Sequence, residues 1–325
     1  MKICFFAPVK NKAILDRNEF YSQDIQILKD LGHSVHIATN YWEITRADLY
    51  LCWWWTWSFP IVLLSNILNK PVICVGTFNY WKFHERNRLQ QFLIEYCLIH
   101  STQNIIVSEL EVSEIKNNWP QLTNINYSPH IFDNESYSPN FESRSDFFLT
   151  ISWLSKGSIY RKGIVNLIES YAFIPVHLKR KLLIVGQIDD GYYELKSLVS
   201  RNNLENFIQF TGEVSKAEKI RLLHQCYAYL QPSIFEGFGL AILEAMACGA
   251  LVVVSKNGAI PEVVGDCGIY FPDIQPETIA GTLIKLDNED LDFRSYGIKA
   301  HTRAKENFAY ERRLSDFSFI IRKLR

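Results

Sequence analysis

The chain has 325 residues, more than one hydrophobic core usually holds, and this length favours two domains. Its formal net charge is −1 at pH 7 and no basic stripe or arm is visible, which argues against a nucleic-acid partner. Seven cysteines are scattered through apolar segments without a C-x-x-C pair, so we predict reduced core residues of a cytoplasmic protein rather than metal ligands or disulfides.

The first half of the chain alternates apolar runs with segments of helical periodicity, which predicts an α/β, doubly wound parallel sheet. The stretch between Asp48 and Lys70 has no charged residue, but Pro60 interrupts it. We therefore favour a buried strand and a short helix that begins near Pro60 over a membrane span. Strands are expected at 2–7, 34–39, 49–55, 71–76 and 104–108, and helices at 19–31, 60–69, 85–100 and 109–117.

Aromatic side chains gather near the expected carboxyl ends of two strands of this half. Their faces could stack on a sugar or touch a lipid. Core packing explains them equally well, since alternate residues of a strand must face the covering helices. These residues are Trp53, Trp54, Trp55, Trp57, Tyr80 and Trp81.

A polar segment at 140–146 precedes a second α/β series with strands expected at 147–152, 181–186 and 208–212. At the end of the chain, apolar residues recur at helical spacing and predict a final helix. They are Tyr310, Leu314, Phe317, Ile321 and Leu324.

The stretch from Gln231 to Gly249 predicts a strand, a tight loop and a helix. The apolar run before it ends at Pro232, a glycine-rich turn follows at 237–239, and a segment of helical composition stops at Gly249. This order places the turn at the carboxyl end of a strand, where open α/β sheets bind ligands.

Two carboxylates in this stretch are candidates for a ligand site. The predicted helix is apolar on every face except at Glu244, so this buried carboxylate needs hydrogen-bond donors, which ligand hydroxyls could supply. With the loop folded back, Glu236 and Glu244 can border one pocket, and the N–H groups at 237–240 favour an anion such as phosphate. The alternative is that Glu244 pairs with a structural arginine and Glu236 is solvated.

Arg161 and Lys162 precede a helix predicted to begin after Gly163. Two exposed cations at a helix N-terminus oppose the macrodipole by about 0.3 to 1 kcal/mol each, and an anion bound between them would reverse that penalty. A solvated basic turn is the alternative interpretation.

The order of these motifs resembles a known family. Glu236, Gly-Phe-Gly-Leu, Glu244 and the runs at 249–255 and 257–265 resemble, without gaps, the donor-binding half of the retaining family 4 glycosyltransferases of GT-B fold. The runs at 31–38 and 128–139 resemble parts of that family's N-terminal domain.

The resemblance implies two Rossmann-like doubly wound domains that face each other across a cleft. Residues 1–141 would form the N-terminal acceptor domain and 142–306 the C-terminal nucleotide-sugar donor domain. Residues 307–325 would form a helix that packs back on the N-terminal domain.

The resemblance also implies a retaining transferase that moves a sugar from a nucleoside diphosphate sugar to a saccharide or lipid-linked acceptor. No cofactor and no metal are expected, the pathway would be cell-surface polysaccharide or glycolipid synthesis, and the location would be cytoplasmic, with peripheral contact at the inner face of the membrane as an option. The implied catalytic residues are Glu236, Lys162 and Arg161. The implied donor-binding residues are Gly237, Phe238, Gly239, Leu240, Glu244, Gly212 and Glu213. Glu244 would bind the ribose hydroxyls.

The N-terminal half departs from the family's pattern. The loop at 8–18 lacks the glycine pair, and the segment at 76–80 lacks a histidine, for which His84 is the nearest replacement and Trp81 an acceptor-side neighbour. In the second half, Trp153 stands where members often carry an arginine.

Two alternative functions therefore stay open. One is a nucleotide-sugar binding protein without catalysis, and the other is an epimerase that shares the two-domain architecture. The sequence Asp290-Leu-Asp292 spells D-x-D, but its acidic neighbours predict an exposed turn rather than a metal site.

Overall fold

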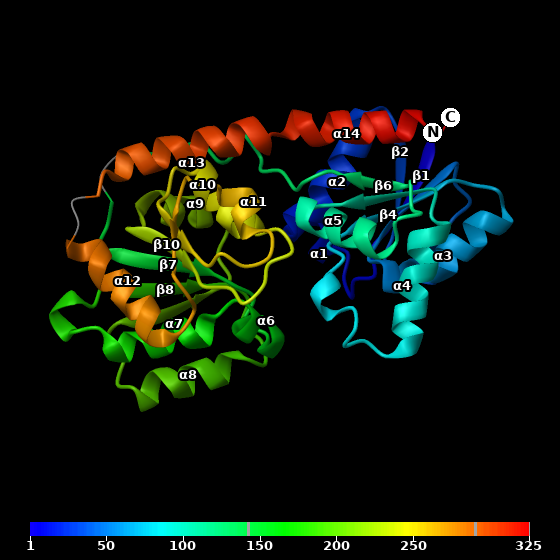
Figure 1. Ribbon diagram of the computed structural model, residues 1–325. Coiled ribbons are helices and arrows are strands. Elements are labelled where there is room, and N and C mark those ends of the chain that lie inside the picture. Colours follow the sequence, from blue (N-terminus) through cyan, green and yellow to red (C-terminus); the bar gives the residue numbers. More distant parts are fainter. Residues whose placement is uncertain (142–143, 289–290, 325) are drawn as a thin grey trace. The chain divides into compact units, whose positions relative to one another are not determined.

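The computed structural model describes residues 1–141, 144–288 and 291–324. Its contacts divide the chain into two compact units, Met1–Ile131 with Tyr310–Arg325, and Phe132–Ala309 (Figure 1). These units are defined by contacts, whereas the limits predicted at 141/142 and 306/307 concern domains and stay a prediction. Each unit is described by itself below.

The first unit contains a parallel six-stranded sheet of order β2-β1-β3-β4-β5-β6. β3 and β4 are central and entirely buried, because helices cover both faces of the sheet. The strands are β1 (Lys2–Phe6), β2 (Ser34–Ala38), β3 (Leu49–Trp53), β4 (Val72–Gly76), β5 (Gln103–Ile106) and β6 (Ile125–Tyr127).

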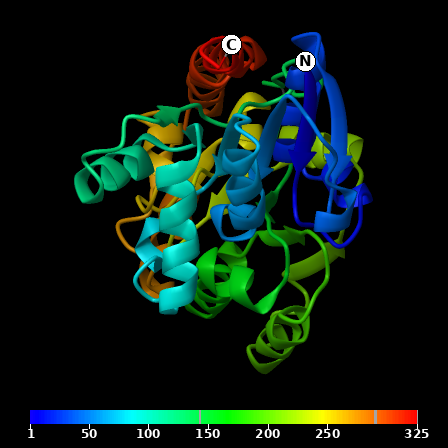
Figure 2. The same ribbon diagram turned by 90° about the vertical axis from the view of Figure 1, so that its right-hand side faces the viewer.

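The helices of this unit pack in two layers. One apolar cluster joins the sheet to α3, α4 and α5, and another joins it to α1, α2 and α14. Figure 2 shows α3 and α4 side by side. The helices are α1 (Ala13–Arg17), α2 (Glu19–Asp30), α3 (Trp55–Ile67), α4 (Arg88–His100), α5 (Glu109–Asn118) and α14 (Tyr310–Arg322). The predicted doubly wound sheet is confirmed.

The expected start of α3 near Pro60 is wrong, since the helix begins at Trp55 and carries Pro60 inside it. The strand before it stops at Trp53, and Trp54 makes the turn with a φ of 69°. The buried side chains of Trp55, Ile61 and Val62 hold this helix on the sheet. Their packing outweighs the hydrogen bond that the proline cannot donate. The expected start of α4 at 85 is also early, because Asn87 caps the helix by accepting from the Gln90 N–H at 2.9 Å.

The second unit contains another parallel six-stranded sheet, of order β12-β11-β10-β7-β8-β9. Figure 1 shows α7, α8 and α12 on one face of this sheet and α9, α10, α11 and α13 on the other. The strands are β7 (Phe147–Ile151), β8 (Lys181–Val185), β9 (Ile208–Gly212), β10 (Ala228–Gln231), β11 (Val252–Val254) and β12 (Ile269–Tyr270). The helices are α6 (Lys156–Arg161), α7 (Ile164–Ser170), α8 (Tyr192–Arg201), α9 (Lys216–Gln225), α10 (Leu240–Ala247), α11 (Ile260–Val264), α12 (Pro276–Asn288) and α13 (Phe293–Asn307).

The final helix, α14, belongs to the unit of the N-terminal sheet, as predicted. Phe317 and Ile321 of its apolar stripe are buried against that unit's core. Arg313 is fully buried on the same helix and pairs with the buried carboxylate of Asp24 on α2, with Nε 2.7 Å from Oδ1.

Three expectations about absent features concern the described residues. All seven cysteines are free and buried. None of the helices in the described ranges combines the length and apolar character that a membrane crossing requires. In the same ranges no three or more His, Cys, Asp or Glu side chains cluster where they could hold a metal ion. Asp290 of the D-x-D sequence lies outside the described residues, while Asp292 caps α13 by accepting from the Ser295 N–H at 2.9 Å.

Candidate active site

The predicted strand, tight loop and helix are present in the second unit. β10 ends at Gln231, α10 begins at Leu240, and Gly239 stands at the helix N-terminus with a φ of 101°. A side chain is strained at that angle, which explains the glycine. The loop between the two elements carries Glu236 at the carboxyl end of the sheet.

Glu236 is the centre of a charged cluster. Its side chain is 7% exposed, and its Oε2 lies 3.0 Å from the Arg161 guanidinium. Its Oε1 lies 3.8 Å from Lys162 Nζ and accepts hydrogen bonds from Gln231 at 2.7 Å and Ser233 at 3.3 Å. The solvated alternative for Glu236 is therefore wrong, because two cations and two neutral donors surround its carboxylate.

Arg161 and Lys162 end one helix as well as preceding another. Arg161 is the last residue of α6 and Lys162 caps it, a helix that the sequence analysis did not predict. The expectation that both cations only oppose a helix dipole is corrected, since cations at the end of α6 are favourable there.

Gly163 allows the two cations to lie beside β10. A Cβ added to Gly163 would lie 2.0 Å from the carbonyl oxygen of Pro232, and its φ is 66°. The Ile234 N–H donates to the Arg161 carbonyl at 2.7 Å. Backbone contact between these segments thus brings the cations to Glu236.

Burial makes the charge of Lys162 costly. Desolvation lowers the pKa of Lys162 below its ordinary value and Arg161 lowers it further, while the carboxylates of Glu236 and Glu244 act in the opposite direction. Lys162 Nζ also donates to the Ile151 carbonyl at 3.3 Å, at the end of β7. A bound anion would stabilise the charged lysine at this place.

Glu244 lies on α10 and is buried, as predicted. Its Oε1 accepts from the Tyr137 hydroxyl at 3.1 Å and from Lys219 Nζ at 2.8 Å. The alternative of a structural arginine is thus wrong in its partner, which is a lysine of α9. That Glu236 and Glu244 border one pocket stays a prediction.

The other predicted donor-side residues lie in different environments. Gly212 ends β9, which is separated from β10 by β7 and β8, and Glu213 after it is exposed. Phe238 is buried, with its ring 5.6 Å from that of Phe308 in an edge-on contact. Trp153 follows β7 and is 54% exposed, so its indole does not replace the cation that relatives carry there.

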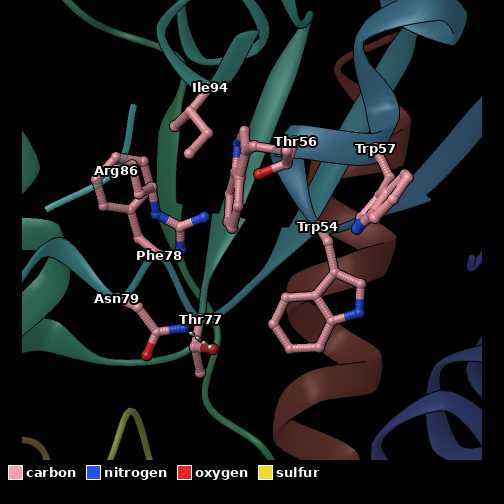
Figure 3. A pocket seen from close by; sticks show the side chains of 9 residues that line it. Trp54, Thr56, Trp57, Thr77, Phe78, Asn79, Arg86 and Ile94 are labelled. Carbon is pink, nitrogen blue, oxygen red and sulfur yellow. Dashed lines mark hydrogen bonds between the residues drawn. The ribbon is translucent and has the colours of Figure 1, made fainter. Parts of the chain in front are cut away.

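The acceptor-side predictions concern the first unit. His84 is exposed, with Nε2 3.1 Å from the Tyr80 hydroxyl, and Trp81 stands below Lys82 Nζ at 4.6 Å from the ring centroid. Neither of them lines the cavity of about 150 Å³ that lies at the carboxyl ends of β3 and β4 (Figure 3).

The aromatic cluster divides between core and cavity. Trp53 is fully buried in the core, whereas Trp54, Trp55 and Trp57 line the cavity. Arg86 lines it as well and was missed, because an isolated arginine before a helix has no distinctive spacing.

Comparisons with known proteins agree with this architecture. The model of the glycosyl transferases group 1 matches residues 142–306. An uncharacterized glycosyltransferase of Methanocaldococcus jannaschii is 33% identical over 197 residues, 58% of this chain and 50% of that protein. The O-antigen chain mannosyltransferase B of Escherichia coli is 32% identical over 135 residues, 40% of this chain and 35% of that protein. The chain thus spans half or less of the length of these curated relatives.

A solved structure is similar over the whole chain. Anabaena HepE in complex with UDP and glucose has a TM-score of 0.79 at 18% identity, and the match covers 99% of this chain and 100% of that one. This similarity confirms the predicted GT-B fold, with one Rossmann-like sheet in each unit. Because the family model also covers half of the sequence, the chain belongs to the glycosyl transferases group 1.

Proposed function

We propose that this chain is a retaining, family 4 glycosyltransferase that moves a sugar from a nucleoside diphosphate sugar to a saccharide or lipid-linked acceptor. The observation that carries the proposal is the convergence of Arg161 and Lys162 on Glu236, at 3.0 and 3.8 Å, at the carboxyl end of the second sheet. Two cations beside one carboxylate suit a ligand with both phosphates and hydroxyls.

The donor would use both ends of this cluster. The diphosphate would lie against Arg161, Lys162 and the backbone N–H groups at the N-terminus of α10, which attract anions. Glu236 would accept hydrogen bonds from the sugar, and Glu244 from the ribose hydroxyls. UDP is bound by the similar Anabaena protein, which supports a nucleoside diphosphate as ligand.

Charge develops on the departing diphosphate during transfer. One cation at about 4 Å in an effective dielectric of about 20 stabilises it by about 4 kcal/mol, roughly three decades of rate. Arg161 and Lys162 therefore make metal-independent transfer physically reasonable. With retention, the acceptor hydroxyl attacks on the face that the diphosphate leaves, and the departing phosphate takes its proton. Proton NMR of the anomeric coupling in the product tests retention.

The acceptor is proposed from the relatives. The similar Escherichia coli protein is named an O-antigen chain mannosyltransferase, which supports a role in cell-surface polysaccharide or glycolipid synthesis. Peripheral contact with a membrane is part of the same proposal, because α3 and α4 expose several large apolar side chains. They are Trp57, Leu63, Leu64, Ile67, Leu89, Phe92 and Ile99.

Thermal unfolding with UDP, GDP, ADP and their sugars, with EDTA throughout, tests the donor site. A ligand at about a hundred times its dissociation constant adds about 2.7 kcal/mol, which raises the melting temperature by several degrees. We expect one nucleotide family to produce this shift, and Glu244→Ala to abolish it because the ribose loses its acceptor.

The matched control is Glu277→Ala, which removes an exposed carboxylate of α12 in the same unit. Each variant is compared with its own ligand-free melting temperature, so lost stability is not confused with lost binding. A shift that survives in Glu244→Ala, or none from any nucleotide at millimolar concentration, contradicts the assigned donor site. Binding without transfer would instead favour the non-catalytic alternative.

A further inference from the structure

The cavity at the carboxyl ends of β3 and β4 contains an arginine with no acidic partner. Figure 3 shows the Arg86 guanidinium directed into the space between Phe78, Thr77 and Thr56. Its Nε is buried without a hydrogen-bond partner, and no ion pair to Arg86 occurs within residues 1–141, 144–288 and 291–324. Burial without a compensating carboxylate lowers the pKa of Arg86.

A structural arginine ordinarily satisfies its donors, as Arg313 does in this same unit. Arg313 donates to the Asp24 carboxylate and to the carbonyls of Ser128 at 2.6 Å and Pro129 at 2.9 Å. An unsatisfied buried donor costs free energy, so the contrast needs a ligand or another reason.

The nearest acidic side chain with a defined role holds the backbone instead. Glu111 accepts from the N–H groups of Phe78 at 2.7 Å and Asn79 at 2.5 Å, and so holds the loop after β4. Its carboxylate maintains the cavity wall.

The walls of the cavity suit a sugar ring. Trp54 and Trp57 provide aromatic faces, on which the C–H faces of a pyranose stack. Thr77 and Asn79 provide polar groups for hydroxyls, and Asn79 Nδ2 already donates to Thr77 Oγ1 at 3.2 Å. A cavity of about 150 Å³ accommodates roughly one six-membered ring.

Backbone conformation at the cavity is also unusual. Trp54 has a φ of 69°, which strains a bulky residue by about 1–3 kcal/mol, a cost found mostly at functional sites. A Cβ on Gly76 would lie 3.3 Å from the Trp54 ring and 3.4 Å from the Trp55 ring. The glycine therefore sets how closely the two indoles approach.

We propose that this cavity binds the ring of an anionic sugar, with Arg86 pairing with its carboxylate or phosphate. The inference rests on the proposed function, since the sugar would be the terminal residue of the acceptor. An arginine fork pairs with either oxyanion through two parallel hydrogen bonds, so the structure indicates the charge but not its source.

Tryptophan fluorescence measures this binding without turnover, because three indoles line the cavity. The full chain is titrated with D-glucuronate, D-glucose 6-phosphate and D-glucose at constant ionic strength. We expect saturable changes with one or both anionic sugars and at least tenfold weaker binding of D-glucose. The stronger of the two anions names the source of the charge.

The variants separate the site from general charge effects. Arg86→Gln should weaken binding of the anionic sugar at least tenfold, and Arg86→Lys should recover only part of it because the fork is lost. Arg88→Gln is the control, since it removes an exposed arginine outside the cavity two residues further along. Equal binding of neutral and anionic sugars, no saturable binding of either anion, or unchanged binding in Arg86→Gln overturns the proposal.

The same preparations separate this proposal from the donor site. Arg86→Gln should keep the nucleotide-induced thermal shift of the wild type. Loss of anionic sugar binding with an intact nucleotide shift refutes only the cavity, whereas loss of the nucleotide shift in the wild type refutes the donor site.

Discussion

Lys162 is the residue whose ionisation most directly links burial to the proposed function. Burial lowers its pKa below the ordinary 10.5, so the free protein loses this charge at lower pH than an exposed lysine does. A bound diphosphate stabilises the protonated form and raises that pKa. Affinity must therefore fall as the pH rises through the pKa of the free protein. Isothermal titration with the bound nucleotide from about pH 7 upward should show this decline, and Lys162→Arg should flatten it because arginine stays charged.

The comparison between the two proteins isolates the lysine. The phosphates are fully ionised above about pH 7, and any titration of the base affects both proteins equally. Parallel profiles for wild type and Lys162→Arg would exclude Lys162 as the diphosphate contact.

At the scale of elements, α14 is held to its unit by one buried ion pair. Arg313 and Asp24 are both fully buried, and Arg313 also donates to the backbone after β6. Arg313→Ala should lower the free energy of unfolding by about 3–5 kcal/mol, because it leaves a buried carboxylate unpaired. Chemical denaturation followed by circular dichroism measures this loss. Arg322→Ala, at the exposed end of the same helix, should cost less than about 1 kcal/mol. Similar losses in both variants would show that the pair does not hold the helix.

At the scale of the whole molecule, the proposed membrane contact depends on the apolar surface of α3. Ile67 is 72% exposed on this helix, which carries no charged residue. Co-sedimentation with phosphatidylglycerol and phosphatidylethanolamine vesicles should recover the wild type. Ile67→Glu should reduce the bound fraction about tenfold, because it replaces inserted apolar area with a charge.

Val176→Glu is the matched control, since Val176 is an aliphatic residue of the other unit with 70% exposure. It should sediment like the wild type. Equal loss in both variants would point to general repulsion by the added charge, and no sedimentation of the wild type contradicts a lipid surface as the partner.

Local patterns in the sequence predicted the two parallel sheets, the glycine turn before α10 and the burial of Glu244. These features depend on residues close together in the chain. Apolar runs mark buried strands, helical spacing marks one covered face, and a glycine marks a backbone angle that other residues avoid. The short helix α6 was missed because its six residues are too few to show periodicity, and the start of α3 was misplaced because packing overrides Pro60.

The sequence by itself thus determined the α/β class, the order of the elements and the loop that carries Glu236. Only the tertiary structure decided that Lys219 and Tyr137 hold Glu244, that Asp24 pairs with Arg313, and that Arg86 enters a cavity without an acidic partner. Asp24 and Arg313 are 289 residues apart, and Tyr137 and Glu244 are 107 residues apart. Local propensity carries no information about such pairs, because they are chosen by the packing of whole elements and by the cost of burying a charge alone.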